Sequence, residues 1–229
     1  PYVQAEELGE ALDVVESRIT KDQGNINDLF DSKLKGLVSR VDTIQLAAPT
    51  IVHIHNHKTN ELTKLEGVQH MHFPELLTIC NSRTDTGQTY NIWLHGPAAT
   101  GKSTAGAMAA IALYGKRRFY TNNKLSGDHQ AMGFINAYGY QRTQFRDAYE
   151  HGGIYLGDEI DGSQPDALLA FNNALANDEC PFPDATIKKH PDFIFIGAAN
   201  TTGSGGSIQY LARMKQDAAF SDRFVFLDW

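Results

Sequence analysis

The feature that most constrains the fold is the octapeptide Gly96-Pro97-Ala98-Ala99-Thr100-Gly101-Lys102-Ser103, which matches the pattern G-x-x-x-x-G-K-[ST] throughout. The apolar residues 90–95 before it predict a strand, and the Ala-rich residues 103–113 after it predict a helix. In this order, strand, turn and helix direct backbone N–H groups at a phosphate. We therefore expect a P-loop rather than a Gly-rich surface turn, with Lys102 on the outer phosphates and the Ser103 hydroxyl on Mg²⁺.

A second apolar run, residues 154–157, ends in two adjacent carboxylates, Asp158 and Glu159. Phosphoryl transfer needs one carboxylate on the metal side and one that orients and activates the attacking water. Downstream of a P-loop, the pair predicts Asp158 as the metal-side group and Glu159 as the base. We interpret Asp161 as a helix-capping or supporting carboxylate rather than a ligand.

Two further polar residues adjoin predicted strands. Residues 193–198 form an apolar run that leads to Asn200, whose amide can bond the attacking water or the γ-phosphate, or can serve as a turn residue. Arg223 precedes the apolar residues 224–227. Its guanidinium can stabilise transition-state charge in its own or a neighbouring subunit, or can form a surface ion pair.

Predicted strands and helices alternate along the second part of the chain. The strands are expected at residues 90–95, 118–121, 154–157, 193–198 and 224–227, and the helices at residues 76–80, 103–113, 145–150 and 165–176. Such alternation predicts an α/β fold with a parallel sheet between helices.

The segment before this part has a different composition. Residues 1–46 hold nine acidic and five basic side chains, so they carry −4 of the total charge of −7. Apolar residues alternate in steps of four and three, which predicts either an oligomerising coiled coil or an amphipathic helix on its own core. The clearest run comprises Phe30, Leu34, Leu37, Val41 and Ile44. We expect a helical segment over residues 1–48.

Residues 49–68 are expected to form a small β-hairpin linker, because residues 51–57 alternate in polarity and a return strand follows at residues 62–65. His53, His55 and His57 share one face of the first strand. No carboxylate or thiol joins these side chains at ligand spacing, so we predict no metal site there and interpret them as histidines on an exposed strand face.

Composition excludes several classes of protein. An excess of Asp and Glu (27) over Lys and Arg (20) argues against a chain that coats nucleic acid with its whole surface. Two isolated Cys residues form no disulfide framework, and neither a membrane span nor a leader is evident, so a cytoplasmic setting is expected. A first residue Pro1 and an abrupt end at Trp229 indicate a fragment.

The order of these motifs resembles that of the AAA+ ATPases. The similarity is to the MoxR-like group, which includes the cobaltochelatase small-subunit ATPase and relatives encoded by bacteriophages, and it covers residues 69–229. The stretches that carry it are GPAATGKST, GGIYLGDEIDGSQPDALLAFNNALAN, CPFPDATIKKHPDFIFIGAANT and LARMKQDAAFSDRF. The resemblance implies a three-layer P-loop fold with a five-stranded parallel sheet over residues 69–229, and a hexameric ring with ATP between subunits.

The resemblance also assigns roles. The nucleotide would contact Gly96, Pro97, Ala98, Ala99, Thr100, Gly101, Lys102, Ser103 and Thr104. Ser103 and Asp158 would hold Mg²⁺. Glu159 would be the base, Asn200 would hold the sensor-1 position, and Arg223 would act as an arginine finger on the next subunit, with Arg213 a second basic residue at that interface. Inserted hairpins at residues 125–144 and 182–190 would face the pore or the substrate. The helical lid of the family, with its sensor-2 Arg, is missing from the chain.

Three functions stay open. The first is a ring-forming ATPase that remodels a protein partner. The second is a motor on nucleic acid in phage DNA metabolism. The short basic cluster Lys188-Lys189-His190 in a candidate hairpin favours it, although this cluster also fits a solvated turn. The third is a nucleotide switch without turnover, against which Glu159 argues, because a switch needs no water-activating carboxylate. No membrane partner is expected.

Overall fold

The computed structural model describes residues 17–18, 21–23, 28, 30–36, 52–56, 61–65, 69–114, 118–206 and 210–229. The chain divides into two compact units, residues 1–50 and residues 51–229. In the first unit the described residues are helical, as predicted, and residues 30–36 expose Phe30 and Leu34. Leu37, Val41 and Ile44 lie outside the described residues, so the coiled-coil pairing stays a prediction.

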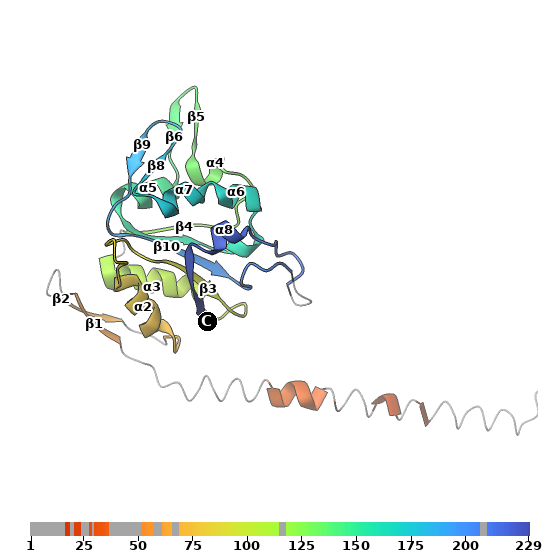
Figure 1. Ribbon diagram of the computed structural model, residues 1–229. Helices are drawn as coiled ribbons and strands as arrows, with labels where there is room; N and C mark the ends of the chain where they lie inside the picture. The colour runs from red at the N-terminus through yellow and green to blue at the C-terminus, as the bar shows by residue number, and fades with distance from the viewer. Residues whose placement is uncertain are drawn as a thin grey trace, which may run out of the picture. The chain divides into compact units, whose positions relative to one another are not determined.

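The second unit is organised around a five-stranded parallel sheet in the order β11-β3-β10-β7-β4, which confirms the predicted sheet. Figure 1 labels β3, β4 and β10 of this sheet. Its strands are β3 (Asn91–His95), β4 (Phe119–Asn122), β7 (Gly153–Gly157), β10 (Phe193–Ala199) and β11 (Phe224–Asp228). Because all five strands run in the same direction, the segments that follow β3, β7 and β10 emerge at one edge of the sheet.

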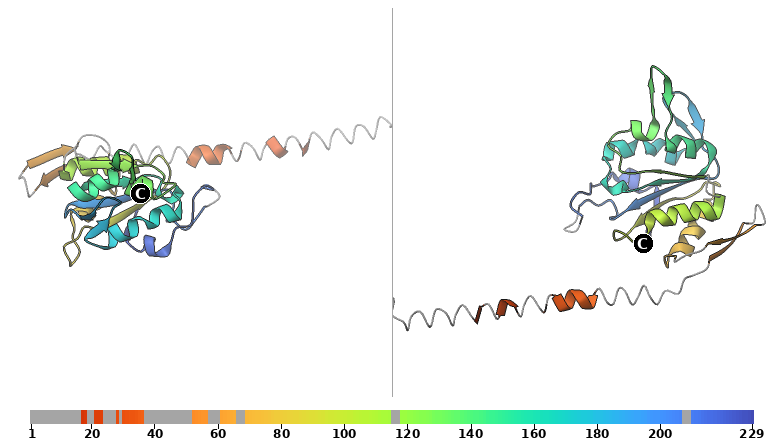
Figure 2. Two further views of the ribbon diagram at one scale, coloured as in Figure 1. Left: turned by 90° about the horizontal axis from the view of Figure 1, so that it is seen from above. Right: turned by 180° about the vertical axis from the view of Figure 1, so that it is seen from behind.

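Helices cover both faces of the sheet (Figure 2). One face carries α2 (Phe73–Asn81) and α3 (Lys102–Tyr114), and the other carries α5 (Gln144–His151), α6 (Pro165–Leu169), α7 (Phe171–Ala176) and α8 (Ala218–Ser221). The prediction of one continuous helix over 165–176 is wrong. The Ala170 N–H bonds the Leu168 carbonyl at the break between α6 and α7, and both Leu168 and Phe171 are buried in the core.

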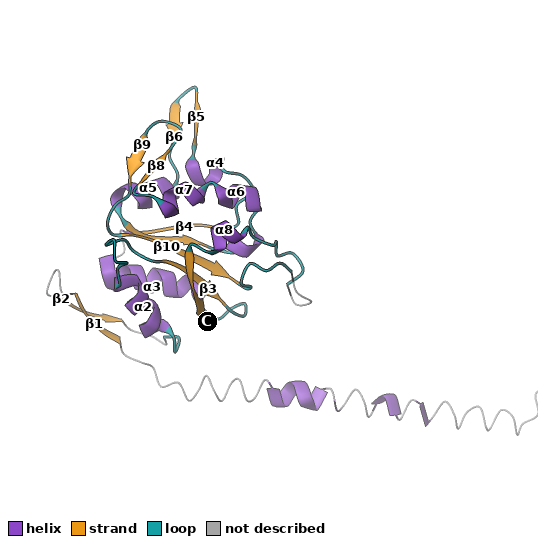
Figure 3. Ribbon diagram, viewed as in Figure 1, coloured by secondary structure: helices purple, strands orange, loops and turns teal. Residues whose placement is uncertain are grey.

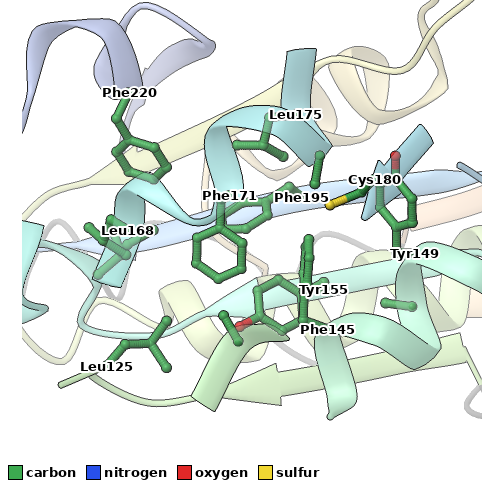
Figure 4. Close-up of a cluster of buried hydrophobic side chains, with 14 of the residues drawn as sticks. Leu125, Phe145, Tyr149, Tyr155, Leu168, Phe171, Leu175, Cys180, Phe195 and Phe220 are labelled. Carbon is green, nitrogen blue, oxygen red and sulfur yellow. The ribbon is translucent and has the colours of Figure 1, made fainter. Parts of the chain in front are cut away.

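The two faces of the sheet have different cores because side chains alternate along each strand. Ile194 and Ile196 point to the face of α3, whose alanines allow close packing. Phe193 and Phe195 point to the opposite face, where α5 and α7 add further rings (Figure 4). There Phe145 meets Phe171 edge to face at a centroid distance of 4.6 Å. Dense aromatic packing of this kind holds the sheet edge in a defined position.

An N-terminal hairpin precedes the sheet. Strands β1 (Val52–Asn56) and β2 (Glu61–Leu65) pair antiparallel, with Val52 opposite Leu65, which confirms the predicted hairpin. Leu65 is 3% exposed and belongs to the same core cluster as α2 and α3. The side chains of His53 and His55, and all of His57, lie outside the described part of the chain.

Two further hairpins project side by side from the face that carries α5 and α7 (Figure 3). After α4 (His129–Met132), β5 (Phe134–Asn136) pairs with β6 (Gly139–Gln141) inside the predicted insertion 125–144. The second hairpin joins β8 (Glu179–Pro181) to β9 (Thr186–Lys188). The predicted range 182–190 starts too late, because the pairing begins with Glu179 opposite Lys188 and continues with the buried Cys180 opposite Ile187.

Arg146 of α5 connects both hairpins. Its side chain is 3% exposed, and Nη1 donates to Asp184 Oδ1 at 2.8 Å in the β8–β9 turn. The guanidinium also lies over the rings of Phe182 and Tyr140, at 4.6 and 5.4 Å from their centroids. Because Tyr140 belongs to β6, one buried cation holds the two projections against α5.

Candidate active site

The candidate site lies where β3, β10 and β7 end. Since these strands are neighbours and parallel, the phosphate loop, Asn200 and the pair Asp158-Glu159 meet at one edge of the sheet. They surround a cavity of about 640 Å³. Its lining comprises Ala98, Ala99, Thr100, Gly101, Lys102, Ser103, Thr104, Asn123, Asp158, Glu159, Ala198, Ala199 and Asn200. Of the expected loop residues, Gly96 and Pro97 are not part of this lining.

The loop itself has the backbone that a phosphate site requires. Gly101 has φ +86°, in the left-handed region that favours glycine, and α3 begins at the next residue. The Lys102 side chain is folded along the loop, where Nζ donates to Gly96 O at 2.9 Å, to Pro97 O at 2.7 Å and to Asn200 Oδ1 at 3.3 Å. Burial lowers the pKa of Lys102, and the nearby Asp158 and Asp161 carboxylates oppose that shift.

The two expected Mg²⁺ ligands lie next to each other. Ser103 Oγ donates to Asp158 Oδ2 at 2.6 Å, and Asp158 Oδ1 accepts the N–H of Glu159 at 3.0 Å. A hydroxyl and a carboxylate at the mouth of a phosphate cavity fit Mg²⁺, which takes few protein oxygens and completes its shell with water and phosphate. Apart from this pair, no cluster of three or more His, Cys, Asp or Glu side chains able to hold a metal occurs among the described residues.

Glu159 occupies a restricted backbone conformation. Its φ of 50° and ψ of 36° lie in the left-handed region, which non-glycine residues rarely adopt. The side chain lines the cavity and is 56% exposed. A carboxylate presented in this way, beside the expected metal ligand Asp158, is suited to accept a proton from a water molecule that enters the cavity.

Asp161 supports the site from beneath. It is fully buried, and its Oδ2 accepts from the backbone N–H groups of Asn200 and Thr201 and from the Thr201 hydroxyl, each at 3.0 Å. The expectation of a supporting carboxylate agrees with these contacts. They fix the end of β10, and therefore the direction in which the Asn200 amide enters the cavity.

The two arginines lie in different places. Phe224 of β11 pairs with Asn91 at the start of β3, and Asn91 Nδ2 donates to Arg223 O at 3.1 Å, so Arg223 lies at the edge opposite the phosphate loop. Asn91 and His95, at the two ends of β3, are four residue steps apart, about 13 Å at ~3.3 Å per residue. Arg213 lies near the carboxylates of its own chain, with Nη2 3.6 Å from Glu159 Oε1, and does not line the cavity.

Several residues at the site carry no motif in the sequence. Asn123, which follows β4, lines the cavity. The Tyr210 hydroxyl accepts the Ala98 N–H at 3.2 Å. Trp229 donates from Nε1 to Thr100 O at 3.0 Å and stacks on His70 at a centroid distance of 4.2 Å. Of these residues, the sequence could have indicated only Asn123, because a polar residue directly after a parallel strand is a signal for the site edge of the sheet.

Comparisons with known proteins bear on the fold. No family model matches the sequence, and no curated protein matches it. A RuvB point mutant from Thermotoga maritima is 15% identical over 61% of this chain and 38% of its own, with a TM-score of 0.43. Hsp104 in a closed state with ATPγS and FITC casein is 17% identical over 64% of this chain and 30% of its own, with a TM-score of 0.50.

The matched region therefore spans well under two thirds of either of those proteins. Among the described residues, no helix is both long and apolar enough to cross a membrane. Three observations indicate the same fold. They are the structural likeness to Hsp104, the five-stranded parallel sheet and the helices on both faces of that sheet. The second unit of the chain has the three-layer α/β fold of the AAA+ P-loop proteins.

Proposed function

We propose that this chain binds ATP with Mg²⁺ and hydrolyses it as an AAA+ ATPase. The observation that supports this is the convergence of Lys102, Ser103, Asp158, Glu159 and Asn200 on one cavity, although the chain separates Lys102 from Asn200 by 98 residues. A nucleotide switch would need the first three of these groups. The presence of Glu159 in the lining supports turnover.

Each residue has a distinct task in hydrolysis. The N–H groups of the loop and the start of α3 bind the phosphates, and the Lys102 ammonium moves from the loop carbonyls to the outer phosphates. Ser103 and Asp158 would hold Mg²⁺, which would supply neutralisation of charge on the phosphate oxygens. Glu159 accepts the proton of the attacking water at a carboxylate oxygen. Asn200, held by Asp161, orients that water or the γ-phosphate.

The position of Arg223 supports assembly into a ring. Because Arg223 lies at the edge of the sheet opposite the P-loop of its own chain, its guanidinium is better placed for the nucleotide of a neighbouring subunit. Head-to-tail contacts of this kind close into a ring when the rotation between subunits allows it. The hexameric number, the place in the MoxR-like group and the membership among phage-encoded relatives are supported by the motif order alone. The exposed Phe30 and Leu34 support a contribution of the N-terminal segment to assembly.

We propose a protein as the partner that this ATPase remodels. The tip of the β5–β6 hairpin exposes Phe134, Ile135 and Tyr138, the last at 95%, and residues 133–141 contain no charged side chain. An uncharged apolar tip suits contacts with a polypeptide better than contacts with a phosphate backbone. A nucleic-acid motor remains the second candidate, supported by the exposed Lys188 of β9.

A cytoplasmic setting is also proposed. Cys80 and Cys180 are both buried free thiols. Burial raises the pKa of Cys80 to about 12 and that of Cys180 to about 11, so neither is poised for oxidation. Unpaired thiols are usual in reducing compartments.

Two substitutions test the proposed activity. Lys102→Ala removes the ammonium group that would contact the phosphates. ATP binding should weaken by about 10- to 100-fold, as expected for a lost charge-assisted hydrogen bond. Glu159→Gln should retain ATP but lower kcat by about 10² to 10⁴. The matched control is Glu179→Gln, which changes an exposed carboxylate in β8. Unchanged ATP affinity in Lys102→Ala, or normal turnover in Glu159→Gln, would refute the assignment.

The Glu159→Gln variant also tests the partner. With ATP bound and unhydrolysed, the ring should hold its substrate. A photoreactive residue placed at position 138, at the tip of the β5–β6 hairpin, should therefore form crosslinked adducts in a lysate only when ATP is present. Protein adducts are expected, and they should be lost when Lys102→Ala is added. Nucleic-acid adducts in place of protein would favour the second candidate.

A further inference from the structure

Arg213 lies between the two carboxylates that follow β7. Its Nη2 is 3.6 Å from Glu159 Oε1, and its Nε is 3.5 Å from Asp161 Oδ2. The Arg213 side chain is 14% exposed, whereas that of Glu159 is 56% exposed. The guanidinium therefore contacts the candidate base from the side of the protein, not from the cavity.

The turn after β7 leaves space for this guanidinium. Gly162 lies in the short 3₁₀ helix Ile160–Gly162, and a Cβ at this position would lie 2.6 Å from Arg213 Nη1. A side chain at position 162 would therefore require the end of the Arg213 side chain to shift.

The segment that carries Arg213 is held by hydrogen bonds on both sides of the arginine. The Met214 N–H donates to Asp161 O at 2.9 Å, and the buried Gln216 Nε2 donates to Asp161 O and Ser163 O, each at 3.4 Å. The Tyr210 hydroxyl accepts the Ala98 N–H of the phosphate loop at 3.2 Å. Residues 210–216 thereby contact both the loop that would bind phosphate and the carboxylate that would activate water.

We propose that Arg213 is a positioning residue that holds Glu159 in a resting orientation, and that residues 210–216 regulate hydrolysis by keeping or releasing this ion pair. The inference rests on the proposed ATPase function. A general base must direct a carboxylate oxygen at the water it deprotonates. While one Glu159 carboxylate oxygen is attracted to the Arg213 guanidinium, which lies outside the cavity lining, the carboxylate is directed at the water less often. A displacement of residues 210–216 releases the ion pair and restores the orientation toward the water.

The test compares ATP hydrolysis by the full chain and three variants. Arg213→Gln should raise kcat about two- to fivefold with an unchanged KM, the range expected when a half-exposed ion pair is released. Arg213→Lys keeps a cation within reach and should stay near the wild-type kcat. Lys215→Gln removes an exposed charge from the same segment and serves as the matched control. A kcat for Arg213→Gln that is unchanged or lower would overturn the proposal.

A second measurement does not depend on turnover. Thermal unfolding of Arg213→Gln, of Glu159→Gln and of the double variant forms a double-mutant cycle. If the pair interacts as described, the double variant loses less stability than the two single variants combined, and strict additivity would contradict the proposal. Failure of the wild-type chain to bind a fluorescent ATP analogue would refute the proposed function, while the cycle would still report on the ion pair.

Discussion

Mixing two inactive variants tests whether Arg223 acts on a neighbouring subunit. Arg223→Ala subunits keep the base Glu159 but lack the finger, and Glu159→Gln subunits keep the finger but lack the base. Because Arg223 lies at the edge of the sheet opposite its own phosphate loop, about 13 Å away along β3, we expect it to complete only the site of another chain. Each variant alone should be inactive, and a mixture should recover activity.

The size of the recovery follows from the geometry. A site is active only when an Arg223→Ala subunit supplies the base and its neighbour on one side is a Glu159→Gln subunit that supplies the arginine. For random head-to-tail assembly, the active fraction is the product of the two subunit fractions, about one quarter of wild-type activity at equal amounts. This maximum does not depend on the number of subunits in the ring.

The assay is steady-state ATP hydrolysis across mixing ratios at constant total protein. The matched control mixes Arg223→Ala with the double variant Arg223→Ala/Glu159→Gln, which contains no finger at all and should stay inactive at every ratio. A curve that peaks at equal amounts supports action between subunits. Absence of recovery at all ratios, with assembly confirmed by light scattering, would refute the reasoning from sheet polarity.

Two further predictions concern stability. Arg146→Ala should lower the free energy of unfolding by about 2–3 kcal/mol, because it removes a buried stem, a cation–π contact and an ion pair. Calorimetry should show a Tm lower by roughly 5–10 °C, and Arg118→Ala, which is 42% exposed, should change little. Hydrogen bonding from Arg142 lowers the pKa of Glu150 below its ordinary value of 4.5. Urea titrations of wild type and Arg142→Gln should therefore differ above pH 4.5 and converge as the pH falls through the lower, folded-state pKa.

Contiguous motifs explain why much of this protein could be predicted from its sequence. The P-loop depends on a local order of strand, turn and helix, so the predictions for β3 and α3 held to within a residue. Strands of the buried sheet are short apolar runs, and each of the five occurs where expected. Errors arose where no local signal existed, as at the break between α6 and α7.

Contacts between distant residues were decided by the tertiary structure alone. The placement of β10 between β3 and β7 brings Asn200 to Lys102, and no local pattern encodes strand order. The pairing of Arg213 with Glu159 likewise depends on how residues 210–216 return across the turn after β7. The amino acids thus specified the chemical groups and their strands, whereas burial and strand order determined which groups meet, because these arise only when the whole core packs.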